Sequence, residues 1–163
     1  MRFPPVPGVR PTPDRVRETL FNWLGQSLEG VRSLELFAGT GVLSLETLSR
    51  GGALAVAVDR HRGVIDALRA TADAFGVTGL ELHVAQARAW LAREARQFDV
   101  IYLDPPFTEE PWEALLPACE ARLADQGLIY AEAAHEIRPS AGLAVHRHAR
   151  AGQVHYHLLA RAA

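Results

Sequence analysis

The sequence contains no lysine, so all 17 of its basic side chains apart from histidine are arginines. Arginine presents a planar fork of donors that clamps phosphates and base edges better than lysine does. A GC-rich genome would produce the same bias, so the absence of lysine alone does not decide between the two interpretations. The formal net charge of −2 argues against non-specific binding of nucleic acid through bulk charge.

The sequence has a single cysteine, Cys119, which excludes an internal disulfide. This cysteine lies in an apolar helical pattern, which favours a buried and inert thiol over a nucleophile. No apolar run is long enough to cross a bilayer, and residues 1–5 lack the hydrophobic core of a signal peptide. We therefore expect a cytoplasmic protein whose 163 residues form one globular domain.

Strand-like and helical segments alternate through most of the chain, which predicts an α/β fold with a mostly parallel, doubly wound sheet. The expected strands are 33–37, 53–58, 80–85, 99–103 and 127–133, and the expected helices are 13–28, 42–49, 61–75, 87–96 and 110–123. In the first helix, the buried stripe is expected to comprise Val16, Leu20, Trp23 and Leu24.

The C-terminal part changes character, because residues 143–148 and 154–159 alternate between apolar and polar side chains. This pattern predicts an antiparallel hairpin that turns near Gly152. Four histidines would share one face of the hairpin, namely His146, His148, His155 and His157. No cysteine or carboxylate accompanies them, so we favour a solvated face over a metal site.

Residues 99–103 form an apolar run that is typical of a strand covered on both faces. This strand must stop at Asp104, because Pro105 and Pro106 have no N–H group for a ladder and have fixed φ angles. A carboxylate, two carbonyls and the ring of Phe107 then face one small space, which suits a planar group carrying an NH2. The alternative is an ordinary exit from a strand into a loop.

A second motif begins with the strand 33–37, which leads into a turn containing Gly39 and Gly41 and then into a helix. Strand, glycine turn and helix open a nucleotide-type binding fold, although Ser44 replaces the third glycine of a dinucleotide fingerprint. Asp59 ends the next strand, at the distance from the turn that is expected of an acid that binds ribose hydroxyls.

Ligands of open α/β sheets bind beyond the carboxyl ends of the strands, where the strand order reverses. The first and fourth strands should meet there, which would bring Gly39 and Gly41 beside Asp104. A cofactor loop would then lie next to a corner that accepts an amine.

The residues Glu35, Phe37, Gly39 and Gly41, taken with the motif 104–107, resemble the S-adenosylmethionine-dependent methyltransferases that act on exocyclic amines of bases. The opening segment 10–24 resembles the signature of the RsmD-type enzymes, which are bacterial guanine-N2 methyltransferases of small-subunit ribosomal RNA. Residues 45–51 and 151–156 are similar to that family as well, so the resemblance covers nearly the whole chain.

This resemblance implies a Rossmann-like methyltransferase domain over 1–163, with a short proline-rich N-terminal segment. It implies transfer of a methyl group from S-adenosylmethionine to the N2 amine of a guanine in small-subunit (16S) ribosomal RNA, within a small-subunit particle and without a metal or a membrane. The implied catalytic residues are Asp104, Pro105, Pro106 and Phe107. The implied cofactor-binding residues are Glu35, Phe37, Gly39, Gly41, Asp59, Arg60, Ala87 and Asp104. The implied RNA-binding residues are Arg10, Thr12, Arg15 and Arg17.

The chain departs from the family pattern in two places. Family members usually begin with an extra basic segment that this sequence lacks. We therefore expect either weak binding to protein-free RNA with reliance on a preassembled ribosomal particle, or a natural protein that begins further upstream. An acid that contacts the adenine amine often follows the third strand, whereas this chain has Gln86, Ala87 and Arg88. Three other functions remain open: a nicotinamide dehydrogenase, which leaves 104–107 without a role, an adenine-N6 methyltransferase, and a non-catalytic RNA-binding assembly factor.

Overall fold

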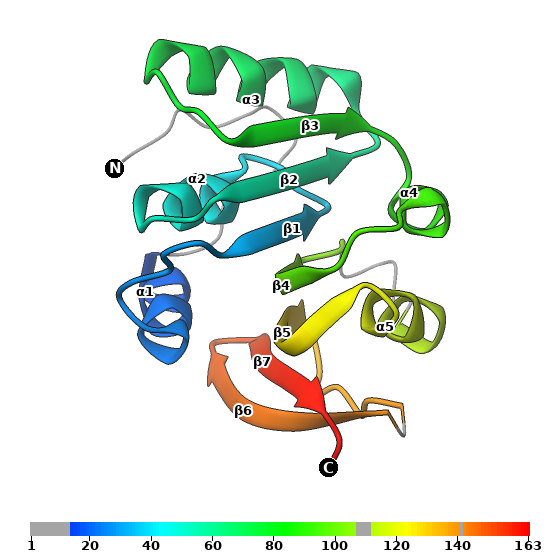
Figure 1. Cartoon of the computed structure of the whole chain (residues 1–163). Coiled ribbons are helices and arrows are strands. Elements are labelled where there is room, and N and C mark those ends of the chain that lie inside the picture. Colours follow the sequence, from blue (N-terminus) through cyan, green and yellow to red (C-terminus); the bar gives the residue numbers. More distant parts are fainter. Residues whose placement is uncertain (1–13, 107–111, 141) are drawn as a thin grey trace.

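Seven strands form one sheet in the described part of the computed structural model, which comprises residues 14–106, 112–140 and 142–163 (Figure 1). The strands are β1 (Arg32–Leu36), β2 (Leu54–Asp59), β3 (Leu80–Val84), β4 (Phe98–Leu103), β5 (Leu123–Ala133), β6 (Leu143–Ala151) and β7 (Val154–Arg161). The helices are α1 (Asp14–Leu24), α2 (Val42–Ser49), α3 (Arg62–Ala74), α4 (Ala87–Arg93) and α5 (Trp112–Glu120). The predicted site residues Arg10, Thr12 and Phe107 lie outside the described ranges.

The strand order is β3-β2-β1-β4-β5-β7-β6. Strands β1 to β5 run parallel, whereas β7 is antiparallel to β5 and β6 is antiparallel to β7. The chain builds outward from β1 to β3 and then crosses back to place β4 on the other side of β1. This arrangement confirms the predicted Rossmann-like methyltransferase fold and its terminal hairpin, and it creates the reversal of strand order between β1 and β4.

Helices cover both faces of the sheet, which explains why the central strands are almost continuously apolar. On one face, Ile101 and Leu103 pack with the residues of α4 and α5, among them Trp90 and Leu115. Cys119 belongs to this layer and is fully buried, and burial raises the pKa of its thiol well above the ordinary value, as predicted for an inert cysteine. No helix within the described ranges combines the length and the hydrophobicity needed to cross a bilayer.

On the other face, Tyr102 of β4 lies under α1 and α2. Its ring meets Phe21 of α1 at 6.4 Å between centroids, and its hydroxyl donates to Thr47 Oγ1 of α2 at 2.7 Å. Thr47 can accept this hydrogen bond because its own proton goes to the carbonyl of Leu43. The central strand is thereby attached to the helix that follows the glycine turn.

Three predicted helix ends were wrong. One is that of α5, which ends at Glu120 rather than at residue 123, since β5 begins at Leu123 rather than at residue 127. The first helix ends at Leu24 rather than at residue 28, because Gly25 adopts a φ of 102° and its N–H donates to the Phe21 carbonyl. Phe21 is buried in α1, whereas Trp23 and Leu24, both predicted as part of the buried stripe, are only half-buried. The Trp23 ring stacks on Tyr156 of β7 at 5.4 Å between centroids. The third error concerns α4, which ends at Arg93 rather than at residue 96 because an extended connection follows it.

The hairpin holds three of the four predicted histidines in one stack. The rings of His148, His155 and His157 lie with centroids 4.7–6.4 Å apart, whereas a one-residue register shift between Val145 and Arg147 removes His146 from their row. His157 is buried, and both of its ring nitrogens are occupied, one by the Ala131 carbonyl and one by the Ile137 N–H. Within the described residues no group of three or more potential ligands is arranged to hold a metal ion.

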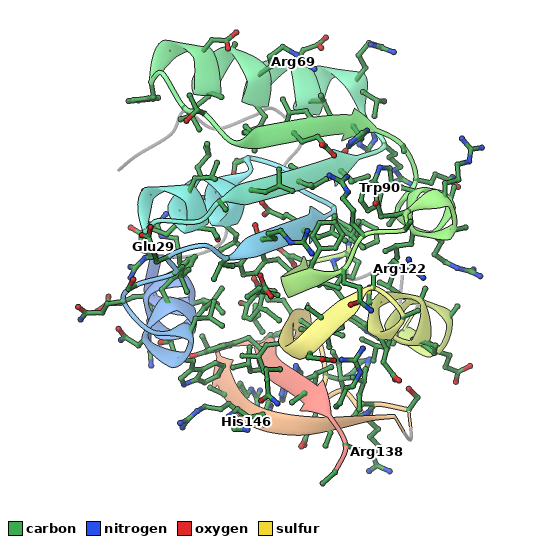
Figure 2. All side chains as sticks on the ribbon, viewed as in Figure 1. Glu29, Arg69, Trp90, Arg122, Arg138 and His146 are labelled. Atoms are coloured by element: carbon green, nitrogen blue, oxygen red, sulfur yellow. The ribbon has the colours of Figure 1, made fainter. Side chains whose placement is uncertain are left out.

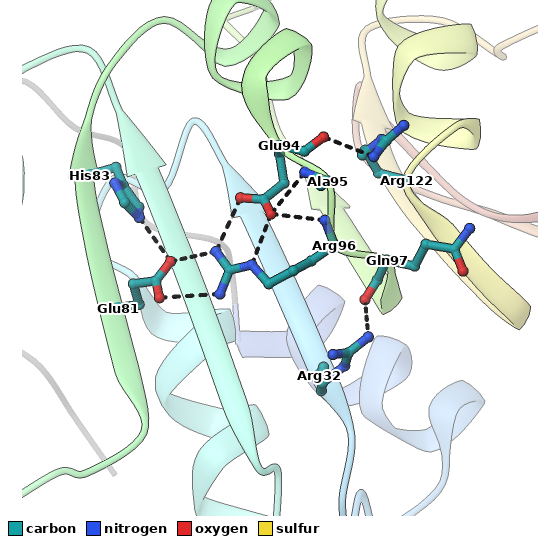
Figure 3. A network of polar contacts seen from close by, with 8 residues as sticks. All are labelled: Arg32, Glu81, His83, Glu94, Ala95, Arg96, Gln97 and Arg122. Atoms are coloured by element: carbon teal, nitrogen blue, oxygen red, sulfur yellow. Dashed lines mark hydrogen bonds and ion pairs between the residues drawn. The ribbon is translucent and has the colours of Figure 1, made fainter.

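A polar network lies at the amino ends of β1, β3 and β4 (Figure 3). The guanidinium of Arg96 donates to Glu94 at 2.8 Å and to Glu81 of β3 at 2.7 Å. Arg32 of β1 donates to the backbone carbonyl of Gln97. These contacts fasten the connection before β4 to both β1 and β3. The hydrogen bond from Arg96 lowers the pKa of Glu94 to about 2, from an ordinary value of 4.5.

We expect Arg96→Gln to lower the free energy of unfolding at pH 7 by about 1–2 kcal/mol, because Glu94 loses its charged partner and the network is partly screened by solvent. The folded-state pKa of Glu94 is depressed, so this stabilisation is present above pH 4.5 and is lost as the pH falls toward about 2. Urea titrations across this pH range should therefore show a difference between variant and wild type that shrinks in acid. Arg93→Gln, on the exposed end of α4, is the control and should change stability by less than about 0.5 kcal/mol. A difference that does not vary with pH would contradict this assignment.

Candidate functional site

The carboxyl ends of β1 and β4 lie side by side, because Leu36 pairs with Leu103 in the parallel ladder. Phe37 therefore follows β1 next to Asp104, which follows β4. This juxtaposition of the glycine turn with the Asp-Pro-Pro corner agrees with the position expected from the strand order (Figure 1). The candidate site is at this edge of the sheet.

The turn after β1 requires left-handed backbone at three positions. Phe37 has φ 59°, Gly39 has φ 57° and Gly41 has φ 71°. The positive φ favours glycine at position 41, and a Cβ atom there would also lie 2.5 Å from the Leu68 side chain of α3, which would have to shift. The strained Phe37 backbone is of the kind that clusters at ligand sites.

Asp59, the last residue of β2, holds the glycine turn from the side. Its Oδ2 accepts the Gly39 N–H at 3.2 Å, and its Oδ1 accepts the His61 N–H at 2.9 Å. The side chain is 11% exposed, so the carboxylate lies at the rim of the site rather than inside the core. The sequence pattern had suggested a ribose-binding acid only, and the contact with the turn is an additional structural role.

Glu35 is a buried carboxyl group directly beneath the turn. Its Oε1 accepts two hydrogen bonds from Ser44 of α2, one from the backbone N–H at 3.0 Å and one from the hydroxyl at 2.6 Å. Burial raises the pKa of Glu35 to about 8, an increase that the hydrogen bonds from Ser44 oppose and that the charges of Asp104 and Asp59 enhance. Ser44, which replaces the third fingerprint glycine, thus supplies the donors that this acid needs.

The residues of the corner after β4 differ in solvent exposure. Asp104 is partly exposed while its Oδ1 is inaccessible to solvent, Pro105 is buried and Pro106 is exposed. Three acids of the site influence one another, since both Asp104 and Asp59 raise the pKa of Glu35. A region with this concentration of carboxyl groups favours a cationic ligand.

A further acid, Glu132, was missed by the sequence reasoning. The pairing of Leu103 with Ala131 brings Glu132 of β5 beside Asp104 in the next row, and its side chain is fully buried. Burial raises the pKa of the Tyr130 phenol well above its ordinary value, and the charges of Glu132 and Asp104 raise it further. A single acid inside the apolar run 127–133 was the signal that could have identified it.

The remaining predicted residues lie on elements around the candidate site and on α1. Ala87 begins α4 close to Asp59, because the preceding Ala85 donates its N–H to the Asp59 carbonyl at 3.0 Å. Arg60 is exposed directly after Asp59. On α1, Arg15 is exposed, whereas Arg17 forms an ion pair with Asp14 at 3.2 Å. An open depression of about 510 Å³ lies elsewhere, between α4 and α5, and is lined by none of the predicted site residues.

Known proteins match this chain over nearly its whole length. The family model described as "Conserved hypothetical protein 95" matches residues 1–160. The chain is 37% identical over 165 residues to "Ribosomal RNA small subunit methyltransferase D" of Escherichia coli (strain K12), covering 98% of this chain and 83% of that protein. The protein of the same name from Haemophilus influenzae is 35% identical, with 77% of this chain and 68% of that protein covered. The solved structure of the Escherichia coli protein yhhF has a TM-score of 0.87 and 38% identity, covering 96% of this chain and 90% of that one.

We expect Ser44→Ala to lower the free energy of unfolding by about 1–2 kcal/mol, because the buried Glu35 loses a donor. The deficit should grow as the pH rises toward about 8, since the ionised carboxylate depends on donors more than the protonated acid does. Urea denaturation at pH 5 and pH 8.5 measures both effects.

Ser49→Ala is the matched control, because Ser49 belongs to the same helix but has an exposed hydroxyl that bonds to Glu46. Its loss should remain below about 0.5 kcal/mol at both pH values. Equal losses in the two serine variants would contradict a special role for the Ser44 hydroxyl.

Proposed function

The chain belongs to the family of ribosomal RNA small-subunit methyltransferase D, and from this premise we propose that it methylates the exocyclic N2 amine of a guanine in small-subunit (16S) ribosomal RNA. The proposed methyl donor is S-adenosylmethionine. The observation that carries the proposal is the pairing of β1 with β4, which brings the glycine turn, Glu35 and Asp104 to one point.

The residues of the site fit this donor in charge and in shape. S-adenosylmethionine is a cationic molecule that supplies an electrophilic methyl group. Three carboxyl groups, those of Glu35, Asp59 and Asp104, surround the proposed binding region and favour a positive ligand. The turn containing Gly39 and Gly41 lets the backbone approach a ligand closely. We propose Asp59 for the ribose hydroxyls, with Phe37, Arg60 and Ala87 completing the cofactor site.

The corner after β4 is proposed to orient the amine. The lone pair of an exocyclic amine is delocalised into the base, which makes the nitrogen a poor nucleophile. The Asp104 carboxylate and the Pro105 carbonyl would accept its two N–H groups and turn the lone pair toward the methyl group. Pro106 stiffens the corner, and we propose that Phe107 stacks on the flipped base. Positioning and electrostatics then supply most of the rate.

We expect Asp104→Ala to lower methyl transfer at least about a hundredfold, because one polar acceptor at the reacting atom is lost. Transfer is measured as labelled methyl incorporated into small-subunit ribosomal RNA and into small-subunit particles that lack the modification. Affinity for S-adenosylmethionine, measured by calorimetry, should change less than about tenfold, since most cofactor contacts remain. Near-normal turnover in this variant would exclude the proposed role of Asp104.

We expect Asp59→Ala to weaken S-adenosylmethionine binding by about 1–3 kcal/mol or more, as for removal of a charged hydrogen-bond partner. Calorimetry of wild type and variant under identical conditions gives the difference. Asp66→Ala is the control, because Asp66 is exposed on α3 and makes no contact with the turn. If Asp59→Ala and wild type bind equally, the ribose role is wrong.

Adenine-N6 methylation is the second candidate function, since a corner that accepts an amine serves either base. Mass-spectrometric mapping of methylated ribosomal RNA from a deletion strain separates the two, because the missing methyl group is identified on guanine or on adenine. The same experiment tests the hypothesis of a non-catalytic assembly factor, because deletion of such a factor would remove no methyl group.

For the RNA we propose Arg10, Thr12, Arg15 and Arg17 as contacts, and a small-subunit particle as the substrate form.

A further inference from the structure

The C-terminal hairpin has a charge composition unlike the rest of the chain. Residues 142–163 contain three arginines and four histidines but no aspartate or glutamate, whereas the whole chain has a net charge of −2. Of these arginines, Arg161 is occupied by backbone carbonyls of residues 120, 123 and 124. Arg147 and Arg150 are exposed on β6, and neither forms an ion pair with another described residue.

The topology brings part of this hairpin to the carboxyl ends of the parallel strands, where the candidate site lies. Because β7 is antiparallel to β5, His155 pairs with Ala133 at the carboxyl end of β5. On the far side of β7, Arg150 of β6 pairs with His155. The carboxyl end of β6 therefore lies at the same edge of the sheet as Asp104. Only β5 and β7 separate β6 from β4, which corresponds to about 14 Å across the sheet.

Strand β6 is the outer strand of the sheet and is open to solvent. Residues 144–148 are all exposed, and no strand of the described chain pairs with the outer side of β6. Figure 2 shows His146 and Arg138 at this end of the molecule, with Arg69 of α3 at the opposite end. A long exposed edge with positive side chains is a ready contact for a polyanion.

Flat rings accompany the charges. The imidazole rings of His148 and His155 are nearly parallel, with an interplanar angle of 5° and centroids 5.2 Å apart. Nε2 of His148 lies 3.0 Å from Nδ1 of His155. Arg150 donates from Nε to the Gly152 carbonyl at 2.7 Å, which leaves the outer nitrogens of its guanidinium for a ligand. One acid is close, because Glu136 lies 4.0 Å from His148 and is itself well exposed.

We propose that Arg147 on one face of the hairpin, with His148, Arg150 and His155 on the other face, here together called the β6 basic edge, bind phosphates and a base of the ribosomal RNA next to the target nucleotide. This inference rests on the proposed function and adds a second RNA-contacting surface to the arginines before and within α1. Charge complementarity favours RNA, since the edge has arginines and no acid of its own. Histidine and arginine planes also stack on unpaired bases.

The experiment compares Arg147→Gln/Arg150→Gln with wild type and with the control Arg69→Gln/Arg93→Gln, which removes two exposed arginines from α3 and α4. Binding to protein-free small-subunit ribosomal RNA is measured from about 50 mM salt upward, where phosphate contacts are strongest. We expect the β6 variant to lose at least about tenfold in affinity at the lowest salt, and its salt slope to fall by about 1.5–2, equivalent to two phosphate contacts. The control should match wild type, and all three proteins should bind S-adenosylmethionine equally.

Arg150 bonds to the hairpin turn, so the double variant could disturb that turn. The single variant Arg147→Gln avoids this effect, because Arg147 makes no hydrogen bond to the turn. Its salt slope should fall by about 1, with an unchanged thermal midpoint. Unchanged affinity and slope in both β6 variants would overturn the inference. Loss of binding to small-subunit particles with full retention of RNA affinity would also overturn it, since the edge would then contact a protein.

If the proposed function itself is wrong, the methylation assay of the wild-type protein gives a different result. In that case wild-type protein would incorporate no methyl group into ribosomal RNA or particles, whatever the β6 edge binds. An active wild type with an inactive Asp104→Ala, combined with β6 variants that bind RNA as wild type does, would remove the β6 edge and leave the proposed function intact.

Discussion

The candidate site depends on the pairing of β1 with β4. These strands are separated by more than sixty residues of sequence, and their ladder is set by Leu34, Leu36, Ile101 and Leu103 on the face that packs against the α4–α5 layer. A slip of one residue would turn every side chain of β4 to the opposite face of the sheet. Tyr102 would then leave Thr47, and Asp104 would no longer follow β4 beside the turn after β1. The hydrophobic core therefore sets the position of the polar corner.

The glycine turn is held from two sides by carboxyl groups that also belong to the site. Glu35 lies beneath the turn and accepts hydrogen bonds from Ser44 at the start of α2, and Asp59 lies beside it and accepts the Gly39 N–H. Burial keeps the pKa of Glu35 near 8, so this acid is largely protonated at neutral pH. A positive ligand would favour its ionised form. The same groups thus serve the local structure and the electrostatic preference of the site.

The amino ends of the strands carry stabilising contacts, whereas their carboxyl ends carry the candidate site. At the amino ends of the strands, Arg96 joins Glu94 to Glu81 and thereby ties the connection before β4 to β3. At the carboxyl ends, buried and half-buried acids are concentrated around a strained turn, an arrangement that costs stability. A well-bonded edge opposite the site is consistent with the need to offset that cost.

The sequence by itself determined the order of strands and helices, the reversal of strand order and the places of both motifs at the ends of strands, because apolar periodicity, glycines and prolines act over a few residues. The functional roles of all the predicted site residues remain predictions, and Phe107, Arg10 and Thr12 in addition lie outside the described residues. Only the tertiary structure decided which acids lie side by side, since the placement of Glu132 beside Asp104 depends on the register between β4 and β5. It also decided that the carboxyl end of β6 lies at the edge of the site, because the antiparallel return of β7 carries the hairpin there. Local pattern cannot specify such contacts, because they depend on how distant segments pack into one core.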